Sequence, residues 1–336
     1  MAVAVGLRRG DWVEVRSEHE ILATLDASAS LDGLPFMEEM RRFEGRRFRV
    51  AARADGFCVE GTSTLRGVAD AVFLEGLRCD GEAHGGCRRA CLMVWKEAWL
   101  RPLGAMDMLA LTESDVTGSE ALGESRANIE DQEVGNGCSA AAAPSNFRPP
   151  VSATDGIFVC QSTELLRATV PRPRRGLRGR VRQLRAGEIT SEEFIRAIGS
   201  ALADRALDRI LKLVRAAGGL LSTSETGRYD KKKSSVGLRP GDLVQVRGLA
   251  EIATTLDARR RNRGLEFCAG MAAHAGRTYR VKRRIDRIIL ETTGAMKKVP
   301  DTVVLDGVAC EGCPRKNEFY WREAWLTRAA NQVIDR

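Results

Sequence analysis

The sequence is poor in aromatic residues, which make up 5% of 336 residues, and it has three histidines. No run of about 18 apolar residues could cross a membrane, and the N-terminus lacks the apolar core of a signal peptide. A glycine-rich phosphate loop, an HExxH motif and a serine nucleophile elbow are also missing from the sequence. We therefore expect a cytoplasmic protein with no membrane partner, and a binding role rather than catalysis.

The composition nevertheless suits a folded protein. Hydrophobic residues make up 43% of the chain, enough to bury the cores of two or three domains. The net charge of +8 favours acidic partners such as nucleic acid. Nine cysteines, an odd number, are more typical of free thiols or metal ligands than of disulfides in a reducing compartment.

An internal repeat organises the chain. Residues 7–50 align without a gap to residues 238–281, at an offset of 231 residues. The same offset pairs Phe36 with Phe267 and Cys79 with Cys310. The second copy then shortens, before VWKEAWL of the first copy meets YWREAWL of the second. The chain therefore contains two diverged copies of one module.

Each copy has the pattern of a small β-barrel. Alternating Val13 and Val15 follow a Gly-Asp turn, and residues 47–50 and 72–74 continue the strand pattern. The last strand is predicted to carry two tryptophans on one face. About five short strands per copy suit a closed barrel. We expect a mainly β fold of two tandem SH3-like barrels.

Composition changes between the copies predict the other segments. A capping box of Thr190 and Glu193 and an apolar stripe from Phe194 to Val214 predict helix, whereas Ser, Gly, Ala and Pro mark linkers. The expected organisation is a first module at 7–103, a disordered linker at 104–156, a basic helical segment at 157–217, a linker at 218–236 and a second module at 237–329.

Several motifs resemble known proteins. The opening Gly-Asp-x-Val-x-Val of each copy resembles the SH3-like and KOW-type barrels of translation and transcription proteins. LEGLRCDGEAHGGCRRACLMVWKEAWL, YWREAWL and CQSTELLRAT resemble an uncharacterised bacterial family with the same two-module layout. The resemblance implies the architecture and no activity. That family carries cysteines where this chain has Glu44 and Asp301, which weakens the expectation of metal in the second copy.

The first copy has a candidate metal site. Its possible ligands are four cysteines and one histidine, namely Cys58, Cys79, His84, Cys87 and Cys91. Four thiolates, or three with the histidine, could form a tetrahedral Zn²⁺ site that staples the loop. An iron–sulfur cluster uses the same ligands. Reduced thiols without metal are the simpler alternative.

The second copy retains fewer ligands. Cys310 and Cys313 form a Cys-x2-Cys pair, but Ile289 replaces Cys58 and Asn317 stands where Cys91 would be. Two ligands bind a metal weakly, so we expect a degenerate site here.

Two further features suggest binding surfaces. Aromatic platforms can stack bases or peptide side chains, and each copy contributes two tryptophans: Trp95, Trp99, Trp321 and Trp325. Basic residues could neutralise phosphates, above all Arg174, Arg175, Arg178 and Arg182 in the centre, with a second run at 259–263. The alternatives are a barrel core for the tryptophans and a solvated face for the arginines.

Three functions therefore stay open. We favour a non-enzymatic binding or scaffold protein with a structural zinc site, which contacts nucleic acid through its basic segments. A protein-interaction adaptor without nucleic acid is the first alternative, and a metalloenzyme or iron–sulfur electron carrier is the second.

Overall fold

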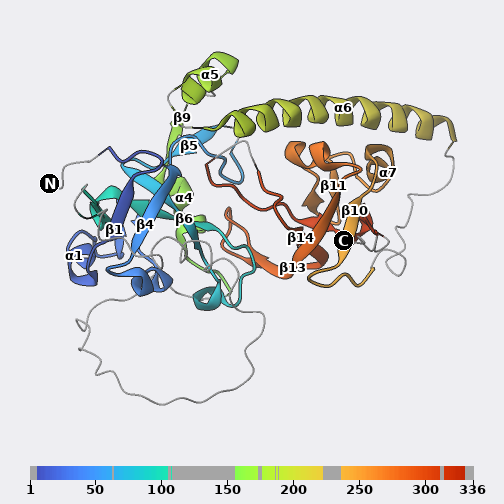
Figure 1. The fold of residues 1–336 in the computed structure, drawn as a ribbon. Coiled ribbons are helices and arrows are strands. Elements are labelled where there is room, and N and C mark those ends of the chain that lie inside the picture. Colours follow the sequence, from blue (N-terminus) through green and yellow to red (C-terminus); the bar gives the residue numbers. More distant parts are fainter. Residues whose placement is uncertain are drawn as a thin grey trace, which may run out of the picture. The chain divides into compact units, whose positions relative to one another are not determined.

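The computed structural model describes residues 6–62, 64–104, 107, 156–172, 176–185, 187, 189–221, 236–310 and 314–329. The described part of the chain is rich in strands, in keeping with the predicted β-rich modules (Figure 1). It divides into two compact units. The first comprises Met1–Arg174 with Ile289–Met296, and the second comprises Arg175–Ile288 with Lys297–Arg336.

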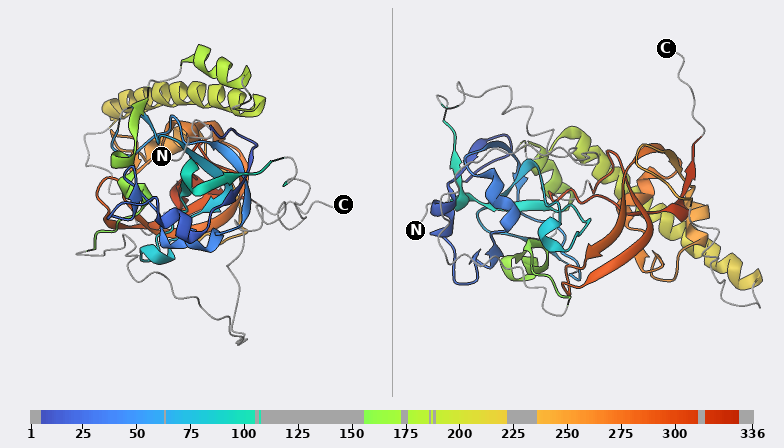
Figure 2. Two further views of the ribbon diagram at one scale, coloured as in Figure 1. Left: turned by 90° about the vertical axis from the view of Figure 1, so that its left-hand side faces the viewer. Right: turned by 90° about the horizontal axis from the view of Figure 1, so that it is seen from below.

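The first unit is built on a five-stranded sheet with the order β7-β6-β4-β1-β8. Neighbouring strands run antiparallel, and the sheet curls as a half-barrel (Figure 2). Val13 and Val15 point into the core, as their alternation predicts. The strands are β1 (Trp12–Val15), β4 (Arg47–Arg53), β6 (Ala71–Arg78), β7 (Leu92–Lys96) and β8 (Leu100–Pro102).

Short elements complete this unit. Strand β5 pairs with β9, which ties the chain after residue 156 to the first unit. These elements are α1 (Glu18–Leu22), β2 (Ser30–Leu31), β3 (Leu34–Pro35), η1 (Glu38–Phe43), β5 (Leu65–Gly67), η2 (Glu82–His84), η3 (Glu97–Trp99), α4 (Gln161–Ala168) and β9 (Val170–Arg172).

The tryptophans form the core of each unit. Phe36 packs edge-on against Trp99, with ring centroids 5.3 Å apart, and Phe43 packs in the same way against Trp95. Trp95 lies on β7 and Trp99 lies in the 3₁₀ turn η3, so the prediction that they share one strand is wrong. The proposed aromatic binding face is also contradicted, because 0% of the surface is exposed for all four of Trp95, Trp99, Trp321 and Trp325.

The second unit contains a sheet with the order β15-β14-β13-β10-β16. Its first pairs keep the register of the first sheet: Leu243 faces Arg280, as Trp12 faces Arg49. The elements are β10 (Leu243–Val246), α7 (Leu249–Thr254), β11 (Arg261–Asn262), β12 (Leu265–Glu266), η4 (Ala269–His274), β13 (Thr278–Ile289), β14 (Met296–Leu305), β15 (Trp321–Arg322), η5 (Glu323–Trp325) and β16 (Leu326–Arg328). The turn between β13 and β14 belongs to the first unit.

A buried glutamate anchors the start of each sheet. Glu97 accepts the first described backbone N–H and pairs with Arg53 at 2.8 Å. Glu323 accepts the N–H groups of residues 236–238 and pairs with Arg284 at 2.5 Å. Both carboxylates are buried, so their hydrogen bonds replace those lost to water. This contact holds the entering chain against the sheet in both units.

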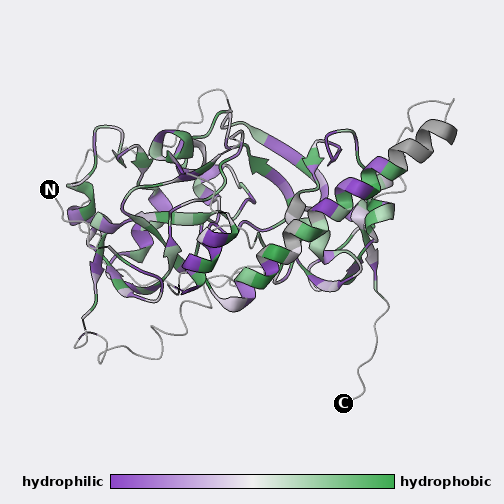
Figure 3. Ribbon diagram, turned by 90° about the horizontal axis from the view of Figure 1, so that it is seen from above, coloured by the Kyte–Doolittle hydropathy of each residue, from purple (hydrophilic) through white to green (hydrophobic). Residues whose placement is uncertain are grey.

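Two helices belong to the second unit: α5 (Leu177–Arg185) and α6 (Ser191–Leu221). The predicted capping box is confirmed, because Thr190 and Glu193 exchange backbone-to-side-chain hydrogen bonds. Leu207 and Leu211 of α6 enter the core of the unit. Ile198 and Leu202 are exposed, so the predicted apolar stripe is buried only in part. Figure 3 shows apolar and polar residues alternating along α6.

The predicted segment boundaries agree with the structure only in part. The helical segment expected at 157–217 is divided, with α4 in the first unit and α5 and α6 in the second. Helix α6 extends to Leu221, past the predicted start of the second linker. The rest of that linker and nearly all of the linker at 104–156 lie outside the described residues. Among the helices that the structure describes, none is long and apolar enough to cross a membrane.

Candidate metal centre

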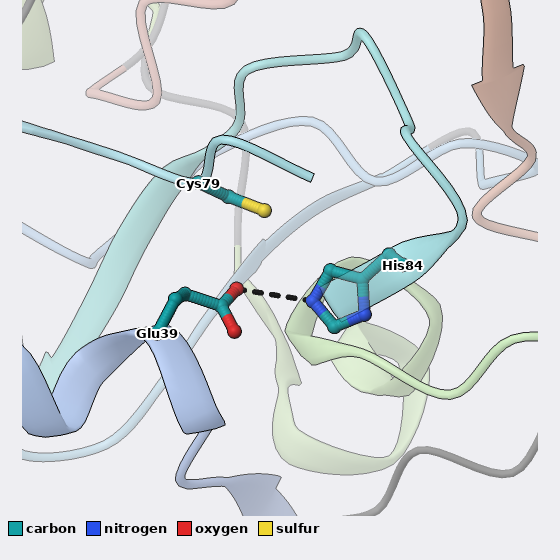
Figure 4. A group of neighbouring side chains, drawn as sticks. All are labelled: Glu39, Cys79 and His84. Atoms are coloured by element: carbon teal, nitrogen blue, oxygen red, sulfur yellow. Dashed lines mark hydrogen bonds and ion pairs between the residues drawn. The ribbon is translucent and has the colours of Figure 1, made fainter. Parts of the chain in front are cut away.

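Three ligand-type side chains of the first unit meet in its interior. Atoms of Glu39, Cys79 and His84 lie within 4.8 Å of one another, and this is the one such group of three among the described residues. Figure 4 shows the thiol, the carboxylate and one imidazole nitrogen directed toward a common point. The set offers one sulfur, one oxygen and one nitrogen ligand.

Short backbone elements place these side chains. Glu39 lies on η1, where Met40 and Phe43 are also buried, so the turn that packs these apolar residues also directs the carboxylate inward. Cys79 follows the last residue of β6, and its N–H donates to the carbonyl of Cys91 at 2.9 Å. A strand end is a rigid place to mount a ligand.

His84 lies in a tight loop framed by glycines. Gly81 has a φ of 78°, and a Cβ there would lie 1.9 Å from the carbonyl oxygen of Cys87. Only glycine fits this position, because both the conformation and the close approach exclude a side chain. The His84 N–H donates to the Gly81 carbonyl at 3.0 Å, which closes the turn.

The centre is buried and incompletely hydrogen-bonded. His84 Nε2 and Glu39 Oε1 lie 3.0 Å apart, and the side chains are 2% and 5% exposed. Glu39 Oε2 and His84 Nδ1 are buried without a hydrogen-bond partner. An unsatisfied buried polar atom costs about 1–3 kcal/mol, so two in one cluster suggest a missing ligand.

The protonation states of Glu39 and Cys79 suit a site that binds a cation. Burial raises the pKa of Glu39, but the hydrogen bond and charge of His84 outweigh it, so the net pKa is lowered. Burial, followed by the charge of Glu39, raises the pKa of Cys79 well above its usual value. Without a cation, the cluster therefore combines a carboxylate with a neutral thiol.

The other predicted ligands do not join this group. Cys58 is exposed, because it follows Phe57, whose side chain fills the core, and neighbouring residues of an extended chain face opposite sides. Cys87 accepts the N–H of Ile289 at its sulfur, at 3.4 Å. Cys91 donates to the hydroxyl of Ser162 at 3.6 Å. The prediction that four cysteines converge is therefore wrong, and His84 is the expected substitute.

Two buried residues of the first unit are not singled out by the sequence analysis. Glu39 is a member of the group, and its one signal is that an acid stands where the repeat has Gly270. Cys160 precedes α4 and is buried, which raises the pKa of its thiol to about 12. The charge of Cys91 is the second cause of this rise.

The second unit has no comparable group among its described residues. The Cys310 N–H donates to the Asn317 carbonyl at 2.8 Å, so Asn317 does stand at the position of Cys91. Cys313 lies outside the described residues. A Cβ at Gly270 would lie 2.5 Å from the ring of Phe319, which fills this space.

The predicted basic residues divide into two classes. Arg178 and Arg182 are exposed on α5, whereas Arg174 and Arg175 lie outside the described residues. Helix α5 contains no acidic residue and buries no side chain. In the second run, by contrast, Arg260 pairs with Asp208 and Arg263 pairs with Asp301.

Comparisons with known proteins give no further guidance, since no family model, curated protein or solved structure matches the chain.

Proposed function

We propose that the chain is a non-enzymatic binding or scaffold protein with two diverged SH3-like modules, the first of which is stapled by Zn²⁺. The observation that carries this proposal is the buried group of Glu39, Cys79 and His84, with its two unpartnered polar atoms. Shared sheet order and register at positions 231 residues apart support the two-module reading.

The ligand chemistry favours zinc over the alternatives. Zn²⁺ takes mixed sulfur, nitrogen and oxygen ligands, whereas iron–sulfur clusters need mostly cysteine. Cys91, whose backbone carbonyl accepts the Cys79 N–H, is the nearest candidate along the paired chain for a fourth ligand. Burial of the group leaves a substrate little access, which favours a structural zinc over a catalytic one.

Metal analysis with two matched variants tests the staple. Purified protein is expected to hold about one zinc per chain, and Cys79→Ser is expected to lose both the zinc and thermal stability. Cys310→Ser removes the equivalent thiol of the second copy and is expected to leave both unchanged. Wild-type protein that binds no zinc, even after reconstitution, would refute the proposal.

Nucleic acid is the partner class that a second observation favours. Arg178, Arg180, Arg182 and Arg185 share one helix of nine residues, and no ion pair occupies them within the described part of the chain. Such a cluster can neutralise several phosphates without reading sequence.

Salt-dependent binding of a labelled duplex DNA tests this partner. Changing all four α5 arginines to glutamine is expected to weaken binding and to reduce the slope of log K against log salt by about 3–4. The control changes Arg16, Arg101 and Arg167, whose guanidinium groups already pair with carboxylates. Equal losses of DNA affinity in both variants would contradict a specific role of α5. A wild-type chain that binds no DNA would favour the protein-interaction adaptor.

A further inference from the structure

The turn between β13 and β14, residues 289–296, is held in the first unit by a dedicated pocket. We call this segment the latch. Its Glu291 side chain is 1% exposed. Three donors converge on the carboxylate: Arg89 at 3.1 Å, the Ser162 hydroxyl at 2.9 Å and the Glu60 N–H at 2.9 Å. The pocket is therefore built for one carboxylate.

Backbone contacts fix the rest of the latch. The Glu291 N–H donates to the side chain of Glu60 at 3.1 Å, and Arg89 also donates to the carbonyl of Ile289 at 3.0 Å. At the other end, the Phe158 N–H donates to the Gly294 carbonyl at 2.9 Å. A Cβ at Gly294 would lie 2.7 Å from the Phe158 carbonyl oxygen, so the chains pack closely.

The loop of residues 79–91 contacts the latch through Cys87 and Arg89. It also carries two of the candidate metal ligands, Cys79 and His84. Cys87, which accepts the Ile289 N–H, is three residues from His84. The Cys87 N–H donates to the His84 carbonyl at 3.2 Å, so both lie in one hydrogen-bonded turn. A shift of His84 therefore moves the groups that contact the latch.

This loop has little apolar content with which to order itself. Between Cys79 and Cys91, the buried side chains are those of His84 and Cys87. Among the described residues, the imidazole of His84 hydrogen-bonds to Glu39 and its Nδ1 has no partner. A metal that binds both residues would fix the loop far more firmly than this one hydrogen bond.

We propose that metal binding at Glu39, Cys79 and His84 is coupled to docking of the latch, so that the metal-bound loop presents Cys87 and Arg89 to residues 289–296. This inference rests on the proposed zinc site. Because coupling between two sites is reciprocal, a docked latch also raises the affinity for zinc.

Hydrogen exchange of the full chain, with zinc bound and after chelation, tests the coupling. Chelation is expected to speed exchange of residues 289–296 by about 5- to 100-fold, the usual range of coupling between two sites. Residues 303–305, in the core of the second unit, are expected to exchange equally in both states.

Two charge-matched variants complete the experiment. Glu291→Gln is expected to free the latch and to weaken zinc binding several-fold, since it removes the charge that Arg89 pairs with. Glu82→Gln changes an exposed residue of the same loop and is expected to alter neither property.

The outcomes separate the coupling from the site. Unchanged latch exchange after a verified loss of zinc would overturn the coupling and leave the zinc site standing, as would normal zinc affinity in Glu291→Gln. A wild-type chain that never binds zinc would overturn both.

Discussion

The two units treat equivalent positions of their folds in opposite ways. In the first, Glu39, Cys79 and His84 bring three polar ligand atoms within 4.8 Å. In the second, Gly270 stands at the repeat position of Glu39, which leaves this position without a ligand atom. The second unit fills the space with rings instead of ligands.

An aromatic cluster occupies this place in the second unit. The ring of His274 lies edge-on to the rings of Tyr279, Phe319 and Trp321, and its Nδ1 is 2.6 Å from the Tyr279 hydroxyl. Such rings stabilise a core by packing alone. The second unit fills this place with packed rings, whereas the first places two unpartnered buried polar atoms, Glu39 Oε2 and His84 Nδ1, in one cluster of ligand-type side chains.

The largest loss of stability is expected at the buried glutamate that both units share, Glu97 in the first and Glu323 in the second. Changing either Glu97 or Glu323 to Ala should destabilise its unit by about 3 kcal/mol, because each leaves an arginine and backbone N–H groups without their acceptor. Urea unfolding measures both losses. The control, Glu20→Ala on the exposed side of α1, should cost far less, because its ion pair with Arg16 is exposed to solvent. A large loss in only one unit would break the equivalence.

The second unit should be the more sensitive to mild acid. Burial, then the charges of Arg277 and Arg196, lowers the pKa of His274 from 6.5 to about 4. The unfolded chain therefore binds more protons in this window, and stability should be lost as pH falls from 6.5 toward 4. After allowance for solvent screening, the loss is on the order of 1–2 kcal/mol.

His274→Phe installs the residue that the first copy has at this position, Phe43. The variant should lose this part of the pH dependence of the unfolding free energy. An unchanged pH profile in the variant would contradict the assignment to His274.

The first unit should instead show a pH-dependent metal affinity. The pKa of Cys79 is raised, chiefly by burial, so the thiol must release a proton when it binds zinc. The apparent affinity should therefore rise by about tenfold per pH unit between about pH 6 and 8. Competition with a chromophoric chelator measures it, and an affinity independent of pH would exclude the thiol as a ligand.

The smallest expected effect concerns helix capping. Ser17 caps α1 with its side chain, whereas Gly248 stands at the equivalent cap of α7. Ser17→Ala should cost about 1 kcal/mol, but Ser17→Gly only a few tenths, because glycine leaves the cap open to water. Thermal unfolding compares the two variants, and equal costs would contradict the capping role.

The sequence predicts features that depend on local pattern. The repeat offset, the strand alternation at Val13 and Val15 and the capping box of Thr190 and Glu193 follow from short-range chemistry. The turn between Trp95 and Trp99 is missed, because η3 has three residues, too few to show a helical period in the sequence, and it buries Glu97 and Trp99 two positions apart as a strand would.

The composition of the site depends on contacts that the sequence does not encode locally. Glu39 meets His84 across 45 residues, and a carboxylate beside apolar neighbours gives no sign of its direction. Cysteine count suggests a site built from thiols, yet Cys87 and Cys91 face other partners. The pocket for Glu291 depends on the tertiary fold in the same way.

Zinc K-edge X-ray absorption of the zinc-loaded chain tests the central claim most directly. The group of Glu39, Cys79 and His84, with or without Cys91, predicts one or two sulfur ligands near about 2.3 Å and nitrogen or oxygen ligands near about 2.0 Å. A first shell of four sulfurs would contradict this account and restore the four-cysteine site.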